Sequence, residues 1–81
     1  MNINRIIEEK WILQDIQGFG ILKQYKKCKT LLFSGNFKNI DLKKRQPKSE
    51  DAYQFRISKK YRAICYVEED ELRVVRIDKH Q

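Results

Sequence analysis

The stretch Ala52 to His80, AYQFRISKKYRAICYVEEDELRVVRIDKH, decides the fold of this chain. Apolar side chains alternate along it with polar or basic ones, as in YQFRI at 53–57 and VRID at 75–78. Because a β-strand sends successive side chains to opposite faces, this alternation predicts strands at about 52–58, 61–67 and 72–78. Lys59-Lys60 and Glu69-Asp70 are the expected turns, so residues 52–80 should form an antiparallel three-stranded meander.

With two residues in each turn, the alternation assigns each side chain to one face of the meander. Arg62 falls on the core side in this register. Either it forms an ion pair at the sheet edge, or the first turn is longer and the assignment shifts. The expected core face consists of Tyr53, Phe55, Ile57, Ile64, Tyr66, Val75 and Ile77, and the expected exposed face of Gln54, Arg56, Tyr61, Ala63, Cys65, Val74, Arg76, Asp78 and His80.

Apolar residues upstream of the meander recur with a helical period. They predict one amphipathic helix at about 3–16, with Trp11 anchored in the core, and a second at about 20–34, closed by Gly35. A basic connector with Pro47 spans 37–49. The predicted fold is α+β, a single domain over 1–81 in which an N-terminal two-helix hairpin covers one face of a C-terminal antiparallel three-stranded sheet.

The charge of the chain is concentrated in its middle. The net charge is +7, and residues 20–62 hold thirteen Lys or Arg against three acids, a local +10. Such a focus favours a polyanionic partner, either a nucleic acid or an acidic protein, over a merely solvated basic surface. The side chains expected to bind phosphates are Lys43, Lys44, Arg45 and Lys48 in the connector, Lys59 and Lys60 in the first turn, and Arg76.

Cys28 and Cys65 lie far apart in the sequence, in a helical and a strand pattern, and are predicted to be free buried thiols. With one His and no CxxC pair, neither a metal nor another cofactor is expected. The N-terminal MNINRIIEEK carries acids where a signal peptide would be apolar, and the longest apolar runs are too short to span a membrane. We therefore expect a cytoplasmic protein without membrane contacts.

Arg56, Arg76 and His80 share the predicted exposed face, and together they have the ingredients of RNA phosphodiester cleavage. Arginine neutralises the charge that develops on a pentacovalent phosphate, and histidine can move a proton near neutral pH. The nucleophile would be the 2′-hydroxyl of the RNA itself, so the chemistry requires no metal.

The segment FRISKKYRAICYVEEDELRVVRIDKH resembles the C-terminal half of the RelE/ParE superfamily of bacterial type II toxins, and DLKKRQPK before it is similar to the basic loop of such toxins. The resemblance implies a RelE/ParE-like toxin that is neutralised by a cognate antitoxin. It implies catalytic roles for Arg56 on the first strand of the meander, Arg62 in the Tyr-Arg motif and His80 on the last strand. An opening strand is usual in the family, whereas the residue pattern at 1–7 predicts helix, so an additional N-terminal strand stays open.

Three functions follow from these observations. The leading hypothesis is a toxin that inhibits translation as a ribosome-dependent mRNA endoribonuclease. The second is a non-catalytic, ParE-like toxin that acts by binding DNA gyrase, and the third is a non-toxic basic module that binds nucleic acid. The antitoxin is expected to be acidic and to cover the helix pair or the face of Arg56, Arg76 and His80.

Overall fold

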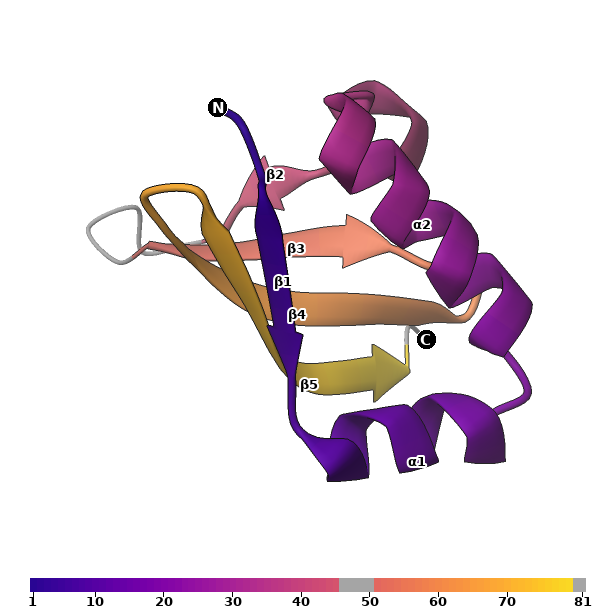
Figure 1. Ribbon diagram of the computed structural model, residues 1–81. Helices are drawn as coiled ribbons and strands as arrows, with labels where there is room; N and C mark the ends of the chain where they lie inside the picture. Colours follow the sequence, from indigo (N-terminus) through magenta and orange to yellow (C-terminus); the bar gives the residue numbers. More distant parts are fainter. Residues whose placement is uncertain (46–50, 80–81) are drawn as a thin grey trace.

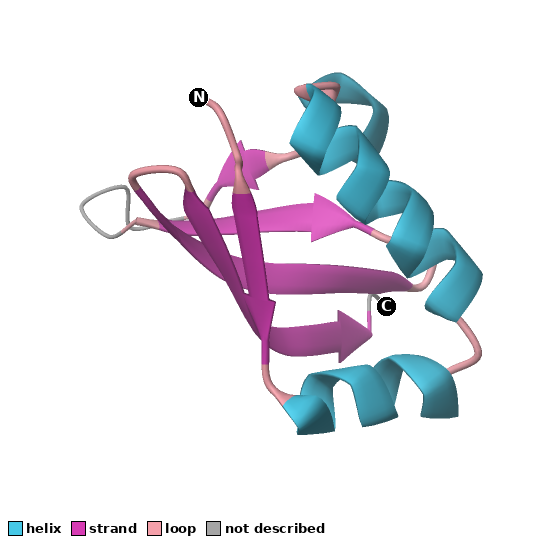
Figure 2. Cartoon of the chain, viewed as in Figure 1, coloured by secondary structure: helices cyan, strands magenta, loops and turns pink. Residues whose placement is uncertain are grey.

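A computed structural model describes residues 1–45 and 51–79 of the chain. Two helices lie against one five-stranded mixed sheet with the strand order β1-β5-β4-β3-β2 (Figures 1 and 2). The elements in chain order are β1 (Arg5–Glu8), α1 (Lys10–Gly18), α2 (Leu22–Ser34), the 3-10 helix η1 (Phe37–Ile40), β2 (Lys43–Lys44), β3 (Ala52–Arg56), β4 (Tyr61–Glu68) and β5 (Glu71–Lys79).

The predicted three-stranded C-terminal sheet was wrong, because strands both precede and follow the helices. β1 pairs in parallel with β5, placing Ile6 beside Leu72, and β2 pairs antiparallel with β3. Isoleucines at 3, 6 and 7 fit a helical stripe as well as a strand, but the nine-residue β5 offers an edge that β1 completes. The connector contributes η1 and the short β2, both of which precede its proline in the sequence.

Because β1 occupies the start of the predicted first helix, α1 begins only at Lys10. Ile12 and Ile16 form its buried stripe, whereas Trp11 is 48% exposed, so the prediction that Trp11 anchors the core was wrong. In α2, Tyr25, Cys28 and Leu32 are buried as their spacing predicts. The apolar stripes of both helices join the sheet in one core.

Gly35 closes α2 with a φ of 80°, a left-handed conformation that glycine adopts without steric cost. Its backbone N–H donates to the carbonyl of Leu32, and the next N–H, from Asn36, donates to Leu31. These bonds end the helix and turn the chain into η1, which leads to the edge strand β2 (Figure 1).

Glu8, the last residue of β1, fastens this strand to α2. One carboxylate oxygen accepts the hydroxyl hydrogen of Tyr25, and the other lies 2.8 Å from the ammonium of Lys29. Burial raises the pKa of the Tyr25 phenol far above its usual value, and the hydrogen bond with the Glu8 carboxylate raises it further. The tyrosine therefore stays protonated and keeps donating to Glu8 throughout the neutral range.

The β3–β4 turn is one residue longer than the sequence analysis assumed. The Ile57 N–H donates to the carbonyl of Tyr61 at 3.0 Å, and Arg56 lies directly opposite Arg62 in the register. The additional residue reverses the predicted faces along the whole of β4. Ala63 and Cys65 therefore lie in the core and Tyr66 is exposed, which corrects the expected assignment of each.

A register shift in β5 partly restores the predicted faces. Arg76 pairs with Ile64 but Val74 pairs with Cys65, so Val75 is the additional residue of a β-bulge. Val74 thus faces the core, contrary to prediction, while Ile77 lies there as expected. We call the side of the sheet away from the helices the outer face; it carries Gln54, Arg56, Arg62, Ile64, Tyr66, Arg73, Arg76 and Asp78.

Candidate functional site

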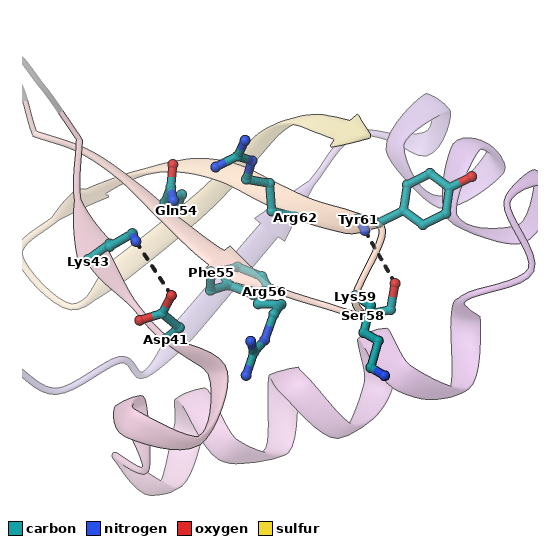
Figure 3. Close-up of a pocket in the computed structure, with 9 residues that line it drawn as sticks. All are labelled: Asp41, Lys43, Gln54, Phe55, Arg56, Ser58, Lys59, Tyr61 and Arg62. Atoms are coloured by element: carbon teal, nitrogen blue, oxygen red, sulfur yellow. Dashed lines mark hydrogen bonds and ion pairs between the residues drawn. The ribbon is translucent and has the colours of Figure 1, made fainter. Parts of the chain in front are cut away.

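A pocket of about 280 Å³ lies at the edge of the sheet, where the short β2 pairs with Tyr53 and Gln54 but does not extend along the second half of β3 (Figure 3). Segments from four parts of the chain line it: the end of η1 with β2, β3, the β3–β4 turn and the start of β4. The lining residues are Asp41, Lys43, Gln54, Phe55, Arg56, Ser58, Lys59, Tyr61 and Arg62.

Two arginines of the pocket face each other across neighbouring strands. Arg56 on β3 and Arg62 on β4 are directly opposed in the antiparallel register, an arrangement that places their Cβ atoms within about 5.5 Å. Like charges at this spacing repel, and Figure 3 shows the two guanidinium groups pointing apart. Guanidinium groups suit the paired oxygens of a phosphate, so each arginine is a candidate ligand for an anion in the pocket.

Lys43 and Lys59 bring two further cations to the pocket from separate segments. The Lys43 ammonium lies 3.5 Å from the Asp41 carboxylate, but both side chains are more than half exposed, so water screens this ion pair. With four cations and one carboxylate among its lining residues, the pocket has a formal charge of +3. An anionic ligand is therefore the class that its electrostatics favour.

Ser58 shapes the turn beside the pocket. Its Oγ accepts the backbone N–H groups of Lys60 and Tyr61, each at 3.3 Å. These bonds fix a turn that lacks glycine, and they hold Lys59 at the rim of the pocket, whereas Lys60 does not line it. Sequence reasoning missed Ser58 because a serine in a turn is common and only the turn length gives it this position.

The Tyr61 ring does not join the arginines of the pocket, although the alternation predicts it on the exposed face together with Arg56 and Arg76. It stacks on Phe19 with ring centroids 4.7 Å apart and points away from the pocket in Figure 3. Phe19 lies in the loop between α1 and α2, so this stack fastens the helix pair to the start of β4. The longer turn is again the reason, because it moves Tyr61 to the helix side.

Three other predicted phosphate ligands that the structure describes lie outside the pocket lining, namely Lys44, Arg45 and Arg76. The Arg76 guanidinium binds the Asp78 carboxylate at 2.7 Å, and Lys44 lies 3.8 Å from the Asp51 carboxylate. Arg45 is half-buried and continues the pairing of β2, since its N–H donates to the Ala52 carbonyl. The predicted Lys48 and His80 lie outside the described residues.

Both cysteines are free buried thiols, which confirms the prediction for each. The Cys28 thiol donates to the carbonyl of Arg56 at 3.5 Å, directly behind the pocket. Burial raises the pKa of Cys28 to about 11 and that of Cys65 to about 12. Both thiols are therefore protonated at neutral pH, and neither is an activated nucleophile.

Within residues 1–45 and 51–79, the structure brings together no cluster of His, Cys, Asp or Glu that could hold a metal ion. Among the same residues, neither helix is long and apolar enough to cross a lipid bilayer. No protein-family model matches the chain, and a search of curated proteins found no match either. The resemblance to RelE/ParE toxins is thus carried by the residues of the meander and its basic connector alone.

Proposed function

We propose that this chain is the toxin of a bacterial type II toxin–antitoxin system and that it inhibits translation by cleaving mRNA on the ribosome. The observation that carries the proposal is the pocket itself. Arg56 and Arg62, which the resemblance to RelE/ParE toxins singles out, share it with Lys43 and Lys59. β1 adds support, because a strand ahead of two helices is the opening that is usual in that superfamily.

The proposed reaction uses the RNA as its own nucleophile. A 2′-hydroxyl oxygen attacks the adjacent phosphorus, and the bond from phosphorus to the 5′ oxygen of the next nucleotide breaks. The products are a 2′,3′-cyclic phosphate and a 5′-hydroxyl end. One proton leaves the attacking hydroxyl and one reaches the departing 5′ oxygen, so the step is balanced without an oxidant or a metal.

The pocket residues have distinct roles in this reaction. Arg56 and Arg62 approach the scissile phosphate from neighbouring strands and stabilise the additional negative charge of the pentacovalent intermediate. Lys43 and Lys59 hold the flanking phosphates from the rim. His80 is the proposed general acid or base, because histidine can move a proton near neutral pH and the resemblance implies this role.

The partners follow from this chemistry. The ribosome positions the mRNA in the proposed cytoplasmic site of action, and the exposed lysines of the connector contact ribosomal RNA through its phosphates. A cognate antitoxin, acidic where it meets the chain, neutralises the toxin by covering the helix pair or the cationic outer face.

The test is to express the chain in bacteria and to map new 5′-hydroxyl ends in translated mRNA. Cleavage should depend on the pocket, so Arg56→Gln and Arg62→Gln should each lower it by roughly 100-fold or more. Lys26→Gln is the matched control, because it removes the same charge from an exposed position on α2, and it should leave cleavage unchanged.

Other outcomes would replace the proposal. Growth arrest with intact mRNA and broken DNA would indicate a toxin that acts on gyrase by protein binding. Harmless expression of the folded chain would indicate a basic nucleic-acid-binding module without toxicity.

A further inference from the structure

We propose that Tyr66 is a stacking platform for an unpaired RNA base on the outer face of the sheet. This inference rests on the proposed function, because it extends the RNA-binding site beyond the phosphate pocket. It assigns a ligand class, single-stranded RNA, to a side chain that the proposed cleavage reaction does not use.

Tyr66 is the one tyrosine of the four whose ring the fold leaves without a role in the described structure. Tyr25 is buried and bonded to Glu8, Tyr61 stacks on Phe19, and Tyr53 packs against the core. Tyr66 is 46% exposed, and among residues 1–45 and 51–79 its side chain makes neither a hydrogen bond nor a ring contact. An exposed aromatic ring in the middle of a strand is thus accessible to a ligand.

The neighbours of Tyr66 leave room for a flat ligand. In the register its partners are Ala52 on β3 and Arg73 on β5. Ala52 has no side chain beyond its Cβ atom and cannot cover the ring. Arg73 is about half exposed, and Glu9 and Glu71 hold its guanidinium, each at 3.8 Å. A base on Tyr66 would therefore also lie near a positioned guanidinium, a group that itself stacks well on bases.

The platform lies in line with the pocket. Tyr66 follows Arg62 by four residues on the same strand and the same face, a separation of about 13 Å along β4. Ile64 between them is 6% exposed and forms a low floor, flanked in the register by Gln54 and Arg76. A single strand that places one phosphate in the pocket can follow this floor and set a base on Tyr66 a few nucleotides away.

The surroundings favour RNA over a protein segment as the occupant. Four arginines, at positions 56, 62, 73 and 76, share the outer face with Tyr66 and outnumber its three carboxylates, at positions 68, 71 and 78. Glu71 and Asp78 pair with Arg73 and Arg76, whereas Arg56 and Arg62 lie at the pocket end of the face. A strand that alternates phosphates with flat bases matches cations interleaved with an exposed ring, and stacking of this kind tolerates any base sequence. An acidic protein segment would match the cations but leave the ring without a specific partner.

The test measures binding of a 2′-O-methyl RNA, which the proposed reaction cannot cleave, to the purified full chain by fluorescence anisotropy at fixed salt. Tyr66→Val should weaken binding roughly ten-fold, because stacking on an aromatic residue contributes substantially to affinity. Tyr66→Phe should bind like the wild type, since the ring remains. Phe33→Ala is the matched control, because Phe33 is 51% exposed but lies on α2, and it should also bind normally.

An abasic position moved stepwise along the oligonucleotide locates the stacked base. At one position the abasic site should weaken binding to the wild type but not to Tyr66→Val. Unchanged affinity of Tyr66→Val, or a wild type that does not bind the RNA, overturns the platform. The Tyr66→Val variant should fold, because valine suits an exposed strand position, and circular dichroism verifies this.

The experiments distinguish a wrong assignment of Tyr66 from a wrong proposed function. If Tyr66→Val binds normally but mRNA cleavage persists and depends on Arg62, only the platform is wrong. If the wild type cleaves no mRNA, the proposed function fails whatever Tyr66 contributes to binding.

Discussion

The two faces of the sheet differ in burial and in charge. On the helix side, Phe55, Cys65 and Leu72 are at most 1% exposed and pack into the common core. On the outer face, Arg56 stands directly opposite Arg62, and Tyr66 is left exposed. Opposed like charges and exposed rings do not stabilise a sheet. The comparison teaches that the helix side maintains the fold, whereas the outer face is available for a ligand.

Substitutions should therefore separate stability from binding, and the largest loss of stability should come from the helix side. Phe55→Ala should lower the free energy of unfolding by about 3–5 kcal/mol, because it leaves a cavity at a position that is 1% exposed. Tyr66→Ala, one strand away on the outer face, should change it by less than about 1 kcal/mol. Urea denaturation followed by circular dichroism measures both, and equal losses would erase the distinction between the faces.

The second-largest loss of stability is expected at alkaline pH, from the buried thiols on the helix side of the sheet. Burial raises the pKa of Cys28 to about 11 and of Cys65 to about 12, from an ordinary 9.0, so the unfolded chain loses these protons first. The folded state is thus fully favoured below pH 9, and its stability falls as the pH rises toward 11–12. Each thiol contributes a slope of up to about 1.4 kcal/mol per pH unit.

Unfolding in urea at pH 8, 9 and 10 gives this slope for the wild type. Cys65→Ala should show a shallower dependence than the wild type, even if its stability at pH 8 is lower. An identical slope in the two proteins would show that the Cys65 thiol is not protected by burial.

The hydrogen bond from Tyr25 on α2 to Glu8 on β1 should contribute less to the free energy of unfolding. Glu8→Ala leaves the buried Tyr25 hydroxyl without its acceptor and should cost about 2 kcal/mol in the free energy of unfolding. Glu9→Ala is the neighbouring control. The Glu9 side chain is 64% exposed, and its ion pair with Arg73 is long, at 3.8 Å, so the substitution should lower the free energy of unfolding by well under about 1 kcal/mol. If the two variants unfold alike, β1 is not held in this way.

The smallest effect on stability is expected on the outer face. Arg56→Gln removes one of two opposed cations and should leave the thermal midpoint unchanged or slightly raised, by the equivalent of less than about 1 kcal/mol. Differential scanning calorimetry in a buffer without phosphate measures this shift. A clear loss of stability would indicate that Arg56 serves the fold rather than a ligand.

The sequence predicted some of this arrangement because some signals are local. Alternation located the three strands of the meander, glycine at position 35 predicted the end of α2, and the two-residue turn at Glu69-Asp70 agrees with the pairing of Glu68 with Glu71. These features depend only on neighbouring residues. The sequence also predicts site roles for the cations at 43, 56, 59 and 62, which all line the pocket.

The remaining features depend on contacts between distant segments. Residues 5–8 form a strand only because β5 offers them an edge, and nothing within MNINRIIE distinguishes that strand from a helical turn. The faces of β4 depend on one additional residue in a turn without glycine, and those of β5 on a bulge at Val75. The longer turn and the bulge each reverse the face of the residues that follow, so the two changes cancel at Ile77. Ile77 therefore lies on the predicted core face although the predicted register is wrong.

The most direct test of the comparison is the affinity of a single-stranded 2′-O-methyl RNA for two variants of equal net charge. Arg62→Gln removes a cation from the pocket, and Lys26→Gln removes one from the exposed side of α2. At a fixed salt concentration, the pocket variant should bind at least ten-fold more weakly than the wild type, and the helix variant less than two-fold. Equal losses in both variants would show that RNA responds only to the overall charge of the protein, which would contradict a phosphate site between Arg56 and Arg62.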